Sequence, residues 1–402
     1  MQMAIIGGGA AGFMGAITAA ETHPDVQVHL FERGKQVLEK VRISGGGRCN
    51  ATHACFDAHE LIKYYPRGSR ELLAPFLRFG PADTISWFEK RGVQLKTEAD
   101  GRMFPVSDRS STIVDCLLQS ARNAGVNIHT STRISRMQPS NGGWVLHAES
   151  WPAPQRFERV LCTPGSSTAV WDMLSELGHH IVPPVPSLFT FNTKDTRLRD
   201  LSGVSTPQST LHIPGAALKA EGPLLVTHWG LSGPAVLRLS AWGARSLAEQ
   251  EHRFPLVINW SGNSTADAIA HLQQTKIADA RKTLHAHAIE GLPLRLWQNL
   301  LVASGIPDTM RWADLDQKRL TALAQQITQS KFDIAGKSTF KEEFVTAGGV
   351  SLKEIDFKTF QSKLHPGLFL AGEVLDIDAV TGGFNFQAAW TGGWIAGGSM
   401  GG

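Results

Sequence analysis

The sequence is poor in cysteine and in net charge. Its four cysteines, Cys49, Cys55, Cys116 and Cys162, include no C-x-x-C pair, which argues against a structural zinc site and a thioredoxin-type redox pair. The spacing of Cys49 and Cys55 permits a disulfide, but four free thiols are the simpler prediction for a reducing compartment. The formal net charge is only +3 over 402 residues, which argues against stable nucleic-acid binding by a broadly basic surface.

The sequence also lacks the features of an exported or membrane protein. Its uncharged first 20 residues contain five glycines and no basic leader, so we expect neither a signal peptide nor a membrane span, and we predict a cytoplasmic protein. His285 and His287, two residues apart in a helical pattern, point to different faces, and we predict no metal site. The length and the ordinary composition, with 42% hydrophobic residues, predict a globular protein of two or three domains.

What the chain has in abundance is clustered glycine. The first cluster follows a short apolar run, residues 3–6, and reads G-x-G-x-x-G at Gly7, Gly9 and Gly12. A helix-compatible segment and the apolar run VQVHLF come next, and Glu32 follows twenty residues after Gly12. Strand, glycine turn, helix, strand and acid form the complete dinucleotide-binding fingerprint. The phosphates are expected at the N-terminus of the helix, and Glu32 is expected to accept hydrogen bonds from the ribose.

The second cluster, ISGGGRCNAT, starts about a dozen residues after the second predicted strand. Three consecutive glycines suggest a backbone that comes very close to a ligand or adopts positive φ. A loop of exposed N–H groups between Arg42 and Arg48 suits an anion or an electron-rich ring edge. A solvated basic loop is the alternative interpretation. The donors predicted here are the amides of Gly45, Gly46 and Gly47, with Asn50 and Thr52 adding short-range donors.

Two further segments repeat the pattern of a strand that ends in a glycine turn. Near the C-terminus, a strand over residues 368–370 leads to Gly372 and Glu373, and Gly382-Gly383 then opens a second small-residue helix. In mid-chain, RVLCTPGSS predicts a strand that ends in a turn at residues 163–165. Two helix N-termini from opposite ends of the chain suit a flavin dinucleotide, with one at the pyrophosphate and the other near the ring.

FAD is the dinucleotide that the whole chain favours. At the ribose, Glu32 argues against a 2′-phosphate, whereas the adjacent Arg33 argues for one. No second strand–GxGxxG–helix unit is found in the middle of the chain, so a separate nicotinamide domain is not expected. One tightly bound FAD, with NAD(P)H as a transient reductant, is therefore predicted.

These segments resemble the BaiN/RdsA family of bacterial flavoproteins. The resemblance extends over almost the whole chain and is most specific in SGGGRCN and TGGFNFQ. It implies an α/β fold: a two-dinucleotide-binding-domain flavoprotein, with a Rossmann-like FAD domain and an inserted β-barrel plus helical region. It also implies an NAD(P)/FAD-dependent oxidoreductase, in a family whose assigned reactions include reduction of C=C bonds in enones, reduction of a uracil in ribosomal RNA, and amine oxidation.

The sequence departs from the family pattern after Thr163. Pro164 stands where a glycine is usual, and the segment at 162–180 is shorter. This departure leaves open whether the turn touches FAD. The residues that we predict to bind FAD are Gly7, Gly9, Ala10, Ala11, Gly12, Glu32, Arg33, Lys40, Gly45, Gly46, Gly47, Arg48, Cys49, Asn50, Thr52, Arg133, Thr163, Gly165, Gly372, Glu373, Asp376, Gly382, Gly383, Phe384 and Asn385.

A proline-rich segment, residues 183–186, marks a predicted domain boundary. The FAD domain is predicted to comprise 1–186 and 351–402, with the inserted domain at 187–350. Within the insertion, short alternating runs predict a barrel over 187–262 and 338–350, and apolar residues at helical spacing predict a helical subdomain over 263–337.

His228 in the segment THWGLSGP is the predicted proton donor, because histidine titrates near neutral pH and the flanking glycines permit a close approach to a ring. Ser232 is predicted to position the substrate. A purely structural histidine in a tight turn is the alternative. A redox role for Cys49 is a weaker hypothesis, based on the neighbouring Arg48, whose charge would lower the thiol pKa.

Three functions remain open at this point. The first is a FAD-dependent oxidoreductase that takes hydride from NAD(P)H and reduces an activated C=C bond in a small-molecule or nucleobase substrate. The second is a FAD-dependent amine oxidase. The third is an RNA-binding or rRNA-modifying flavoprotein. The sequence leaves open the substrate and the oligomeric state.

Overall fold

The computed structural model describes residues 1–289, 291–338 and 345–401, and these residues form two compact units. The first unit comprises Met1–Val185 together with the described residues from Val345 onward. The second unit begins at Pro186 and includes the remaining described residues, up to Ser338. Each unit has its own sheet and its own buried apolar side chains.

A seven-stranded sheet forms the centre of the first unit, in the order β20-β21-β22-β10-β1-β2-β6. The five strands from β22 to β6 run parallel, and β20 and β21 extend the sheet antiparallel. Strand β1 is apolar and almost fully buried, as expected for a parallel sheet covered on both faces. The strands are β1 (Gln2–Ile6), β2 (Gln27–Phe31), β6 (Asn127–His129), β10 (Arg159–Cys162), β20 (Ile355–Asp356), β21 (Gln361–Ser362) and β22 (Leu368–Leu370).

Strand register aligns four loops at one edge of this sheet. Ile6 pairs with both Phe31 and Cys162, and Cys162 pairs with Leu370. Because these residues end parallel strands, the segments that follow them emerge side by side. In open α/β sheets this carboxyl edge is where ligands bind.

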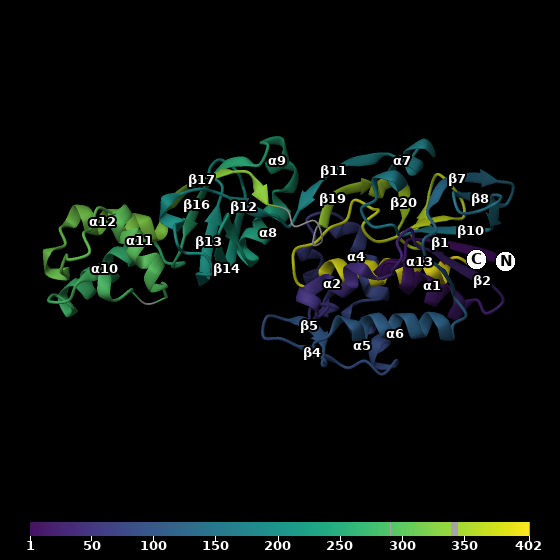
Figure 1. Ribbon diagram of the computed structural model, residues 1–402, viewed down its shortest axis with the longest axis horizontal. Helices are drawn as coiled ribbons and strands as arrows, with labels where there is room; N and C mark the ends of the chain where they lie inside the picture. Colours follow the sequence, from purple (N-terminus) through teal and green to yellow (C-terminus); the bar gives the residue numbers. More distant parts are fainter. Residues whose placement is uncertain (290, 339–344, 402) are drawn as a thin grey trace. The chain divides into compact units, whose positions relative to one another are not determined.

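Helices α1 (Ala10–Thr22) and α13 (Phe384–Ser399) come from opposite ends of the chain and lie side by side (Figure 1). Glycines permit their close approach: a Cβ on Gly393 would lie 2.4 Å from the Ala11 carbonyl oxygen, and one on Gly397 would lie 2.3 Å from that of Gly15. The two backbones therefore touch directly.

Further elements surround this centre. Two three-stranded sheets have the orders β3-β5-β4 and β7-β8-β9, and β11 pairs with β19. The strands are β3 (Thr52–His53), β4 (Leu95–Thr97), β5 (Arg102–Pro105), β7 (Ile134–Ser140), β8 (Gly143–Ala148), β9 (Gln155–Phe157), β11 (Ile181–Ser187) and β19 (Val345–Val350). The helices are α2 (Glu39–Gly47), α3 (Ala58–Leu61), α4 (Ser69–Arg78), α5 (Pro81–Glu89), α6 (Ser110–Asn123) and α7 (Thr168–Glu176).

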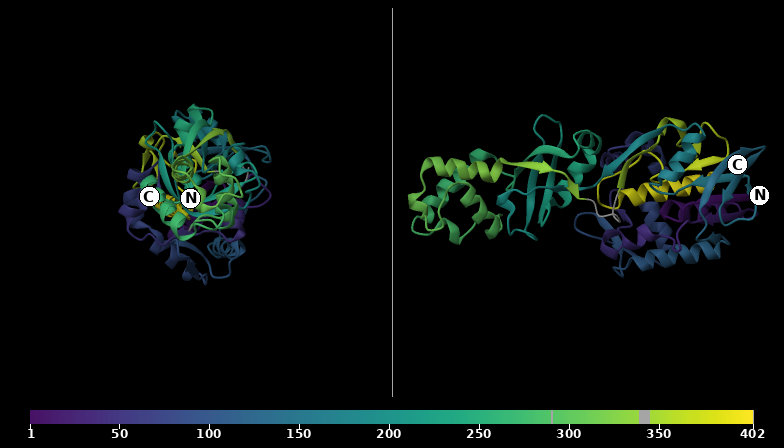
Figure 2. Two further views of the ribbon diagram at one scale, coloured as in Figure 1. Left: turned by 90° about the vertical axis from the view of Figure 1, so that its left-hand side faces the viewer. Right: turned by 45° about the horizontal axis from the view of Figure 1, so that its top comes forward.

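The second unit contains a seven-stranded antiparallel sheet in the order β17-β16-β13-β14-β15-β12-β18. Helices α10, α11 and α12 gather at one end of this sheet (Figure 2). The strands are β12 (Thr190–Asn192), β13 (Ser205–His212), β14 (Lys219–Thr227), β15 (Gly230–Ser232), β16 (Arg253–Asn259), β17 (Ser330–Ala335) and β18 (Lys337–Ser338). The helices are α8 (Pro234–Trp242), α9 (Ala244–Glu249), α10 (Thr265–Ala278), α11 (Leu294–Ala303) and α12 (Gln317–Thr328).

The structure differs from the sequence prediction near the C-terminal end of the expected helical range and of the expected barrel range. The predicted helical range 263–337 includes β17, which pairs along its length with β16. Strand β19, predicted to belong to the inserted domain, lies in the first unit and pairs with β11. Both strands depend on a partner distant in sequence, which local periodicity does not reveal. Residues 339–344 of the predicted barrel lie outside the described residues.

Across the described ranges, no helix combines the length and the apolar character that a membrane crossing requires. The same ranges hold no group of three or more His, Cys, Asp or Glu side chains arranged to bind a metal ion.

Candidate functional site

The first glycine loop is shaped by close packing against the turn after β10. Gly7 has φ 110°, and a Cβ there would lie 2.3 Å from the Thr163 carbonyl oxygen. A Cβ on Gly12 would lie 2.0 Å from the carbonyl oxygen of Gly7. The Thr163 hydroxyl donates to this same Gly7 oxygen over 3.0 Å, so Thr163 holds the first glycine loop through this hydrogen bond. The fold therefore requires glycine at positions 7 and 12.

Gly9 differs from its neighbours because a Cβ on it would meet no atom within 4 Å. This residue is the N-cap of α1. The helix begins at Ala10, followed by Ala11, and no side chain caps its N-terminus with a hydrogen bond. The space beside Gly9 is therefore open next to the first turn of α1, whose N–H groups have no intrahelical partner and which carries the positive end of the helix dipole. This cradle fits a phosphate group.

Glu32 holds the loops after β1 and β2 together. Its Oε2 accepts from the Gly8 N–H over 2.9 Å, and its Oε1 accepts from the Gly34 N–H over 2.7 Å. The predicted role was to accept from a ribose, and each carboxylate oxygen keeps a further lone pair for that purpose. Arg33 and Arg133 are both exposed, and Thr132 N–H donates to the Glu32 carbonyl, which brings the segment before Arg133 to the same edge of the sheet.

The glycine triplet adopts left-handed backbone throughout, with φ of 58°, 66° and 82° at Gly45, Gly46 and Gly47. A Cβ on Gly46 or Gly47 would meet nothing within 4 Å, so these two residues also line open space. The partly exposed side chain of Arg48 is engaged by neighbouring residues: it donates to Glu98 over 2.7 Å, and its guanidinium lies 4.0 Å from the centre of the Phe104 ring. Arg48 thus anchors the triplet loop, a role that the sequence pattern did not distinguish from anion binding.

Cys49 is fully buried, and burial raises the pKa of its thiol to about 12. The sequence hypothesis that Arg48 lowers this pKa is therefore wrong, because Arg48 pairs with Glu98 and desolvation dominates at Cys49. A thiol with this pKa is almost entirely protonated at neutral pH and is a poor nucleophile. A redox role for Cys49 has no support in this environment.

Alkylation of the native protein tests this assignment. At pH 8 a thiol of pKa about 12 is ionised in roughly one molecule in 10,000, so we expect iodoacetamide to label half-buried Cys55 at least ~100-fold faster than Cys49. Peptide mass spectrometry over time measures both rates, and the urea-unfolded protein, in which all four cysteines should react, is the control. Equal labelling of Cys49 and Cys55 in the native state would contradict the burial argument.

A buried polar network joins the triplet loop to α13. The Thr52 hydroxyl donates to Gln387 Oε1 over 2.6 Å, and the Thr84 hydroxyl donates to the same oxygen over 3.0 Å. Gln387 Nε2 in turn donates to the Thr391 hydroxyl over 3.1 Å. The Thr52 hydroxyl therefore links the triplet loop to α13 and is not the free hydrogen-bond donor that was predicted. Sequence reasoning missed Gln387, although it lies four residues after Gly383 within the most specific motif.

The loop after β22 meets two other segments through a salt bridge. Glu373 Oε2 lies 2.5 Å from Lys40 Nζ, and a Cβ on Gly165 would lie 3.6 Å from the same carboxylate oxygen. Gly372 has φ 78° and faces α1, with its Cβ position 3.1 Å from the Ala11 Cβ. Predicted site residues from three distant parts of the chain are thus in contact.

The residues between this loop and α13 hold the backbone in place. Asp376 is buried, and its N–H donates to the Val350 carbonyl over 3.1 Å. Asn385 clamps Ala379, accepting from its N–H over 2.9 Å and donating to its carbonyl over 3.1 Å. The predicted role of Asn385 was direct cofactor contact, whereas its amide is engaged in shaping the loop.

The N-terminus of α13 lies against the triplet loop. Gly382 and Gly383 have φ of 136° and 92°, and a Cβ on Gly383 would lie 2.5 Å from the Thr52 carbonyl oxygen. The Asn50 side-chain oxygen accepts from the Met103 N–H over 3.3 Å, which holds the triplet loop to β5. The helix dipole of α13 therefore ends beside the residues that follow the triplet.

His53 is a second residue that the sequence interpretation missed. Its ring stacks on Phe384 with centroids 4.5 Å apart, and Phe384 stacks on Tyr64 at 4.2 Å. His53 Nε2 donates to the Asp100 carbonyl over 3.1 Å, so Nδ1 carries the lone pair, and this buried atom has no hydrogen-bond partner in the described residues. Burial lowers the pKa of His53. An orphaned acceptor beside Gly382 is consistent with a ligand bound at this helix terminus.

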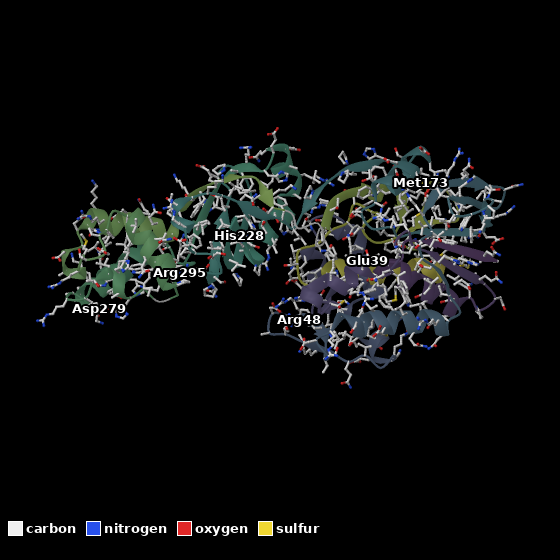
Figure 3. The ribbon with its side chains drawn as sticks, in the orientation of Figure 1. Glu39, Arg48, Met173, His228, Asp279 and Arg295 are labelled. Carbon is white, nitrogen blue, oxygen red and sulfur yellow. The ribbon has the colours of Figure 1, made fainter. Side chains whose placement is uncertain are left out.

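The two predicted catalytic residues belong to the second unit. His228, labelled in Figure 3, is exposed in the turn between β14 and β15, and its ring packs edge-on against Trp229. Ser232 ends β15 and pairs with Leu225. The flanking glycines have a structural reason, since a Cβ on Gly230 would lie 2.2 Å from the Phe191 carbonyl oxygen. The catalytic roles of His228 and Ser232 stay predictions.

The fold of the first unit is that of a Rossmann-like flavoprotein, with its candidate site at the carboxyl edge of the parallel sheet. The model of the HI0933-like protein Rossmann domain matches residues 1–399, and the chain belongs to this family. The predicted resemblance and fold class are thereby confirmed, and the fold and family together define a flavoprotein of the oxidoreductase class.

Curated relatives span nearly the whole chain. The chain is 28% identical to the 3-dehydro-bile acid delta(4,6)-reductase of Clostridium scindens, over 98% of both chains. It is 27% identical to the ribosomal RNA dihydrouridine synthase of Escherichia coli, over 97% of this chain and 95% of that protein.

Two solved structures show the same fold at low sequence identity. An open conformation of a flavocytochrome c3 fumarate reductase matches with a TM-score of 0.52 and 16% identity, over 99% of this chain and 78% of that one. A 3-ketosteroid-delta4-(5alpha)-dehydrogenase from Rhodococcus jostii matches with a TM-score of 0.52 and 15% identity, over 99% of this chain and 96% of that one.

Proposed function

We propose that the loops at the carboxyl edge of the first sheet hold one FAD. The observation that carries this proposal is that Gly9 at the α1 N-terminus and Gly46 and Gly47 in the triplet loop all line open space, while a hydrogen-bond network ties the triplet loop to α13. The α1 N-terminus would bind the pyrophosphate, Glu32 the ribose, and the triplet and Gly382-Gly383 the flavin end. Lys40, Glu373 and Thr163 would support these loops from behind.

We further propose that the enzyme reduces an activated C=C bond, with NAD(P)H as reductant. The two curated relatives described above carry names that indicate reduction of such a bond, one in a bile acid and one in a uridine. Bound FAD supplies hydride transfer, so the protein needs to orient the acceptor, exclude water and deliver a proton. His228 remains the predicted proton donor; its ring is exposed and packs edge-on against Trp229.

The first experiment is an absorbance spectrum of the purified protein, followed by anaerobic titration with NADH and NADPH. We expect a flavin spectrum that bleaches with a pyridine nucleotide and recovers on addition of an enone or a uridine-containing acceptor. Bleaching by amines alone would instead support the amine oxidase. A colourless protein that does not take up added FAD would contradict the proposal.

A uracil base in RNA is the second candidate acceptor, favoured by the names of the relatives from Escherichia coli and Haemophilus influenzae. With a net charge of only +3, any RNA contact must use a local basic patch. Acceptor turnover at increasing salt separates the two cases: an RNA substrate should lose affinity steeply, whereas a neutral enone should not.

A further inference from the structure

A hollow of about 440 Å³ lies in the first unit, bounded by the loop after β2, by α6 and by β6. Its rim carries Lys35, Arg42 and Arg122, and its apolar wall includes Val37, Leu118 and Ile128. The volume lies in the range of sites for small organic ligands. No residue predicted to bind FAD lines it.

The charge in this hollow is uncompensated. Within the described ranges, no carboxylate forms a salt bridge with Lys35, Arg42 or Arg122, and no acidic residue lines the hollow. Other arginines of the first unit do have carboxylate partners: Arg48 pairs with Glu98 and Arg91 with Glu21. Three like charges around one concavity repel one another and raise the local concentration of anions.

The hollow and the glycine loop share one wall. Leu38 N–H donates to the Gly8 carbonyl over 2.8 Å, and Val37 Cγ1 lies 2.9 Å from the Cβ position of Gly8. The side chain of Val37 also lines the hollow, so the loop over residues 35–38 separates it from the open space at Gly9. A ligand in the hollow would therefore contact the loop that supports the proposed cofactor site without occupying that site.

We propose that this hollow binds a nucleoside phosphate, with the phosphate between Lys35, Arg42 and Arg122 and the base against the apolar wall. Arginine forks match phosphate oxygens, and an aliphatic surface accepts the face of a planar base. The source is either a free mononucleotide or the adenosine 2′-phosphate half of NADPH. A concave site of this size fits a mononucleotide, whereas a nucleic-acid strand would need a longer basic groove.

The test uses the FAD-saturated protein and isothermal titration with 5′-AMP, 2′,5′-ADP, inorganic phosphate and adenosine. We expect the two nucleotides to bind and adenosine to bind much more weakly. Arg42→Gln, Arg122→Gln and Lys35→Gln should each weaken nucleotide binding at least ~10-fold, because each removes one phosphate contact. Arg109→Gln is the matched control, since Arg109 is exposed and lies at the opposite end of α6, outside the hollow.

Flavin reduction distinguishes the two sources. A rise in KM for NADPH but not for NADH in Arg122→Gln indicates the 2′-phosphate of the reductant, whereas unchanged values for both indicate a free nucleotide; either result supports the site. The absence of nucleotide binding, equal weakening by Arg109→Gln, or release of FAD by 5′-AMP would overturn it. Flavin absorbance is measured separately from nucleotide binding. A protein that binds FAD but no nucleotide in the hollow is therefore distinguishable from a protein that does not bind FAD.

Discussion

Replacement of Gly9 by valine is expected to leave the protein folded and to weaken its binding of FAD strongly. Gly9 has φ −92° and ψ −166°, an extended conformation that valine adopts readily, and a Cβ there meets no protein atom within 4 Å. The added methyl groups would fill the space before the α1 N–H groups, where the pyrophosphate is proposed to lie. We expect FAD affinity to fall by more than ~100-fold, or about 2.8 kcal/mol.

Fluorescence titration of the apoprotein with FAD measures this loss, and thermal unfolding of the apoprotein measures the fold. The unfolding midpoint should stay within about 1–2 °C of wild type, roughly the shift that 1 kcal/mol produces in a chain of 402 residues. Gly12→Ala is the contrasting variant, because its Cβ would overlap the Gly7 carbonyl oxygen at 2.0 Å and should impair folding and binding together. Normal FAD binding by Gly9→Val would place the pyrophosphate elsewhere.

The second large effect is expected where α1 and α13 touch. Gly397→Ala should destabilise the protein by about 1–3 kcal/mol, because the new Cβ would lie 2.3 Å from the Gly15 carbonyl oxygen and would force the helices apart. Urea unfolding followed by circular dichroism measures the change in midpoint.

Gly398 provides the matched control in the next position of the same helix. A Cβ on Gly398 would lie 3.8 Å from Thr18 Cγ2, an ordinary van der Waals distance. Gly398→Ala should therefore be neutral or stabilising by up to about 1 kcal/mol, since alanine is the better helix former. Equal destabilisation by both substitutions would mean that helix packing does not depend on the backbone contact at Gly397.

The sequence was most informative where local spacing determines structure. The run from residue 3 to Glu32 predicted a strand, a glycine turn, a helix and a second strand, and β1, α1 and β2 follow that order. The glycine triplet suggested either a close approach to a ligand or positive φ, and all three residues have positive φ. These features depend on neighbours within one βαβ unit, so a single sequence contains the information.

Side-chain roles were less predictable because they depend on partners distant in sequence. Arg48 and Thr52 stand in an apparent ligand motif, yet Glu98 and Gln387 occupy their polar groups. The partner of Thr52 is 335 residues away, and no spacing rule connects the two. His53 was identified as a candidate site residue only from the structure, in which its ring stacks on Phe384 and its Nδ1 has no partner among the described residues. Strand β17 was assigned to a helical stretch for the same reason, because its pairing with β16 is non-local.

The direct backbone contact between α1 and α13 also determines when, during synthesis, the proposed cofactor cradle has all of its parts. A nascent chain that has emerged as far as residue 380 already contains β1, β2, β6, β10 and β22, but it has no partner for the glycine-lined face of α1. The proposed cradle for the dinucleotide is complete only after α13 has been synthesised. Because the second unit precedes β19 and α13 in the chain, it is synthesised before the proposed cradle has all of its parts.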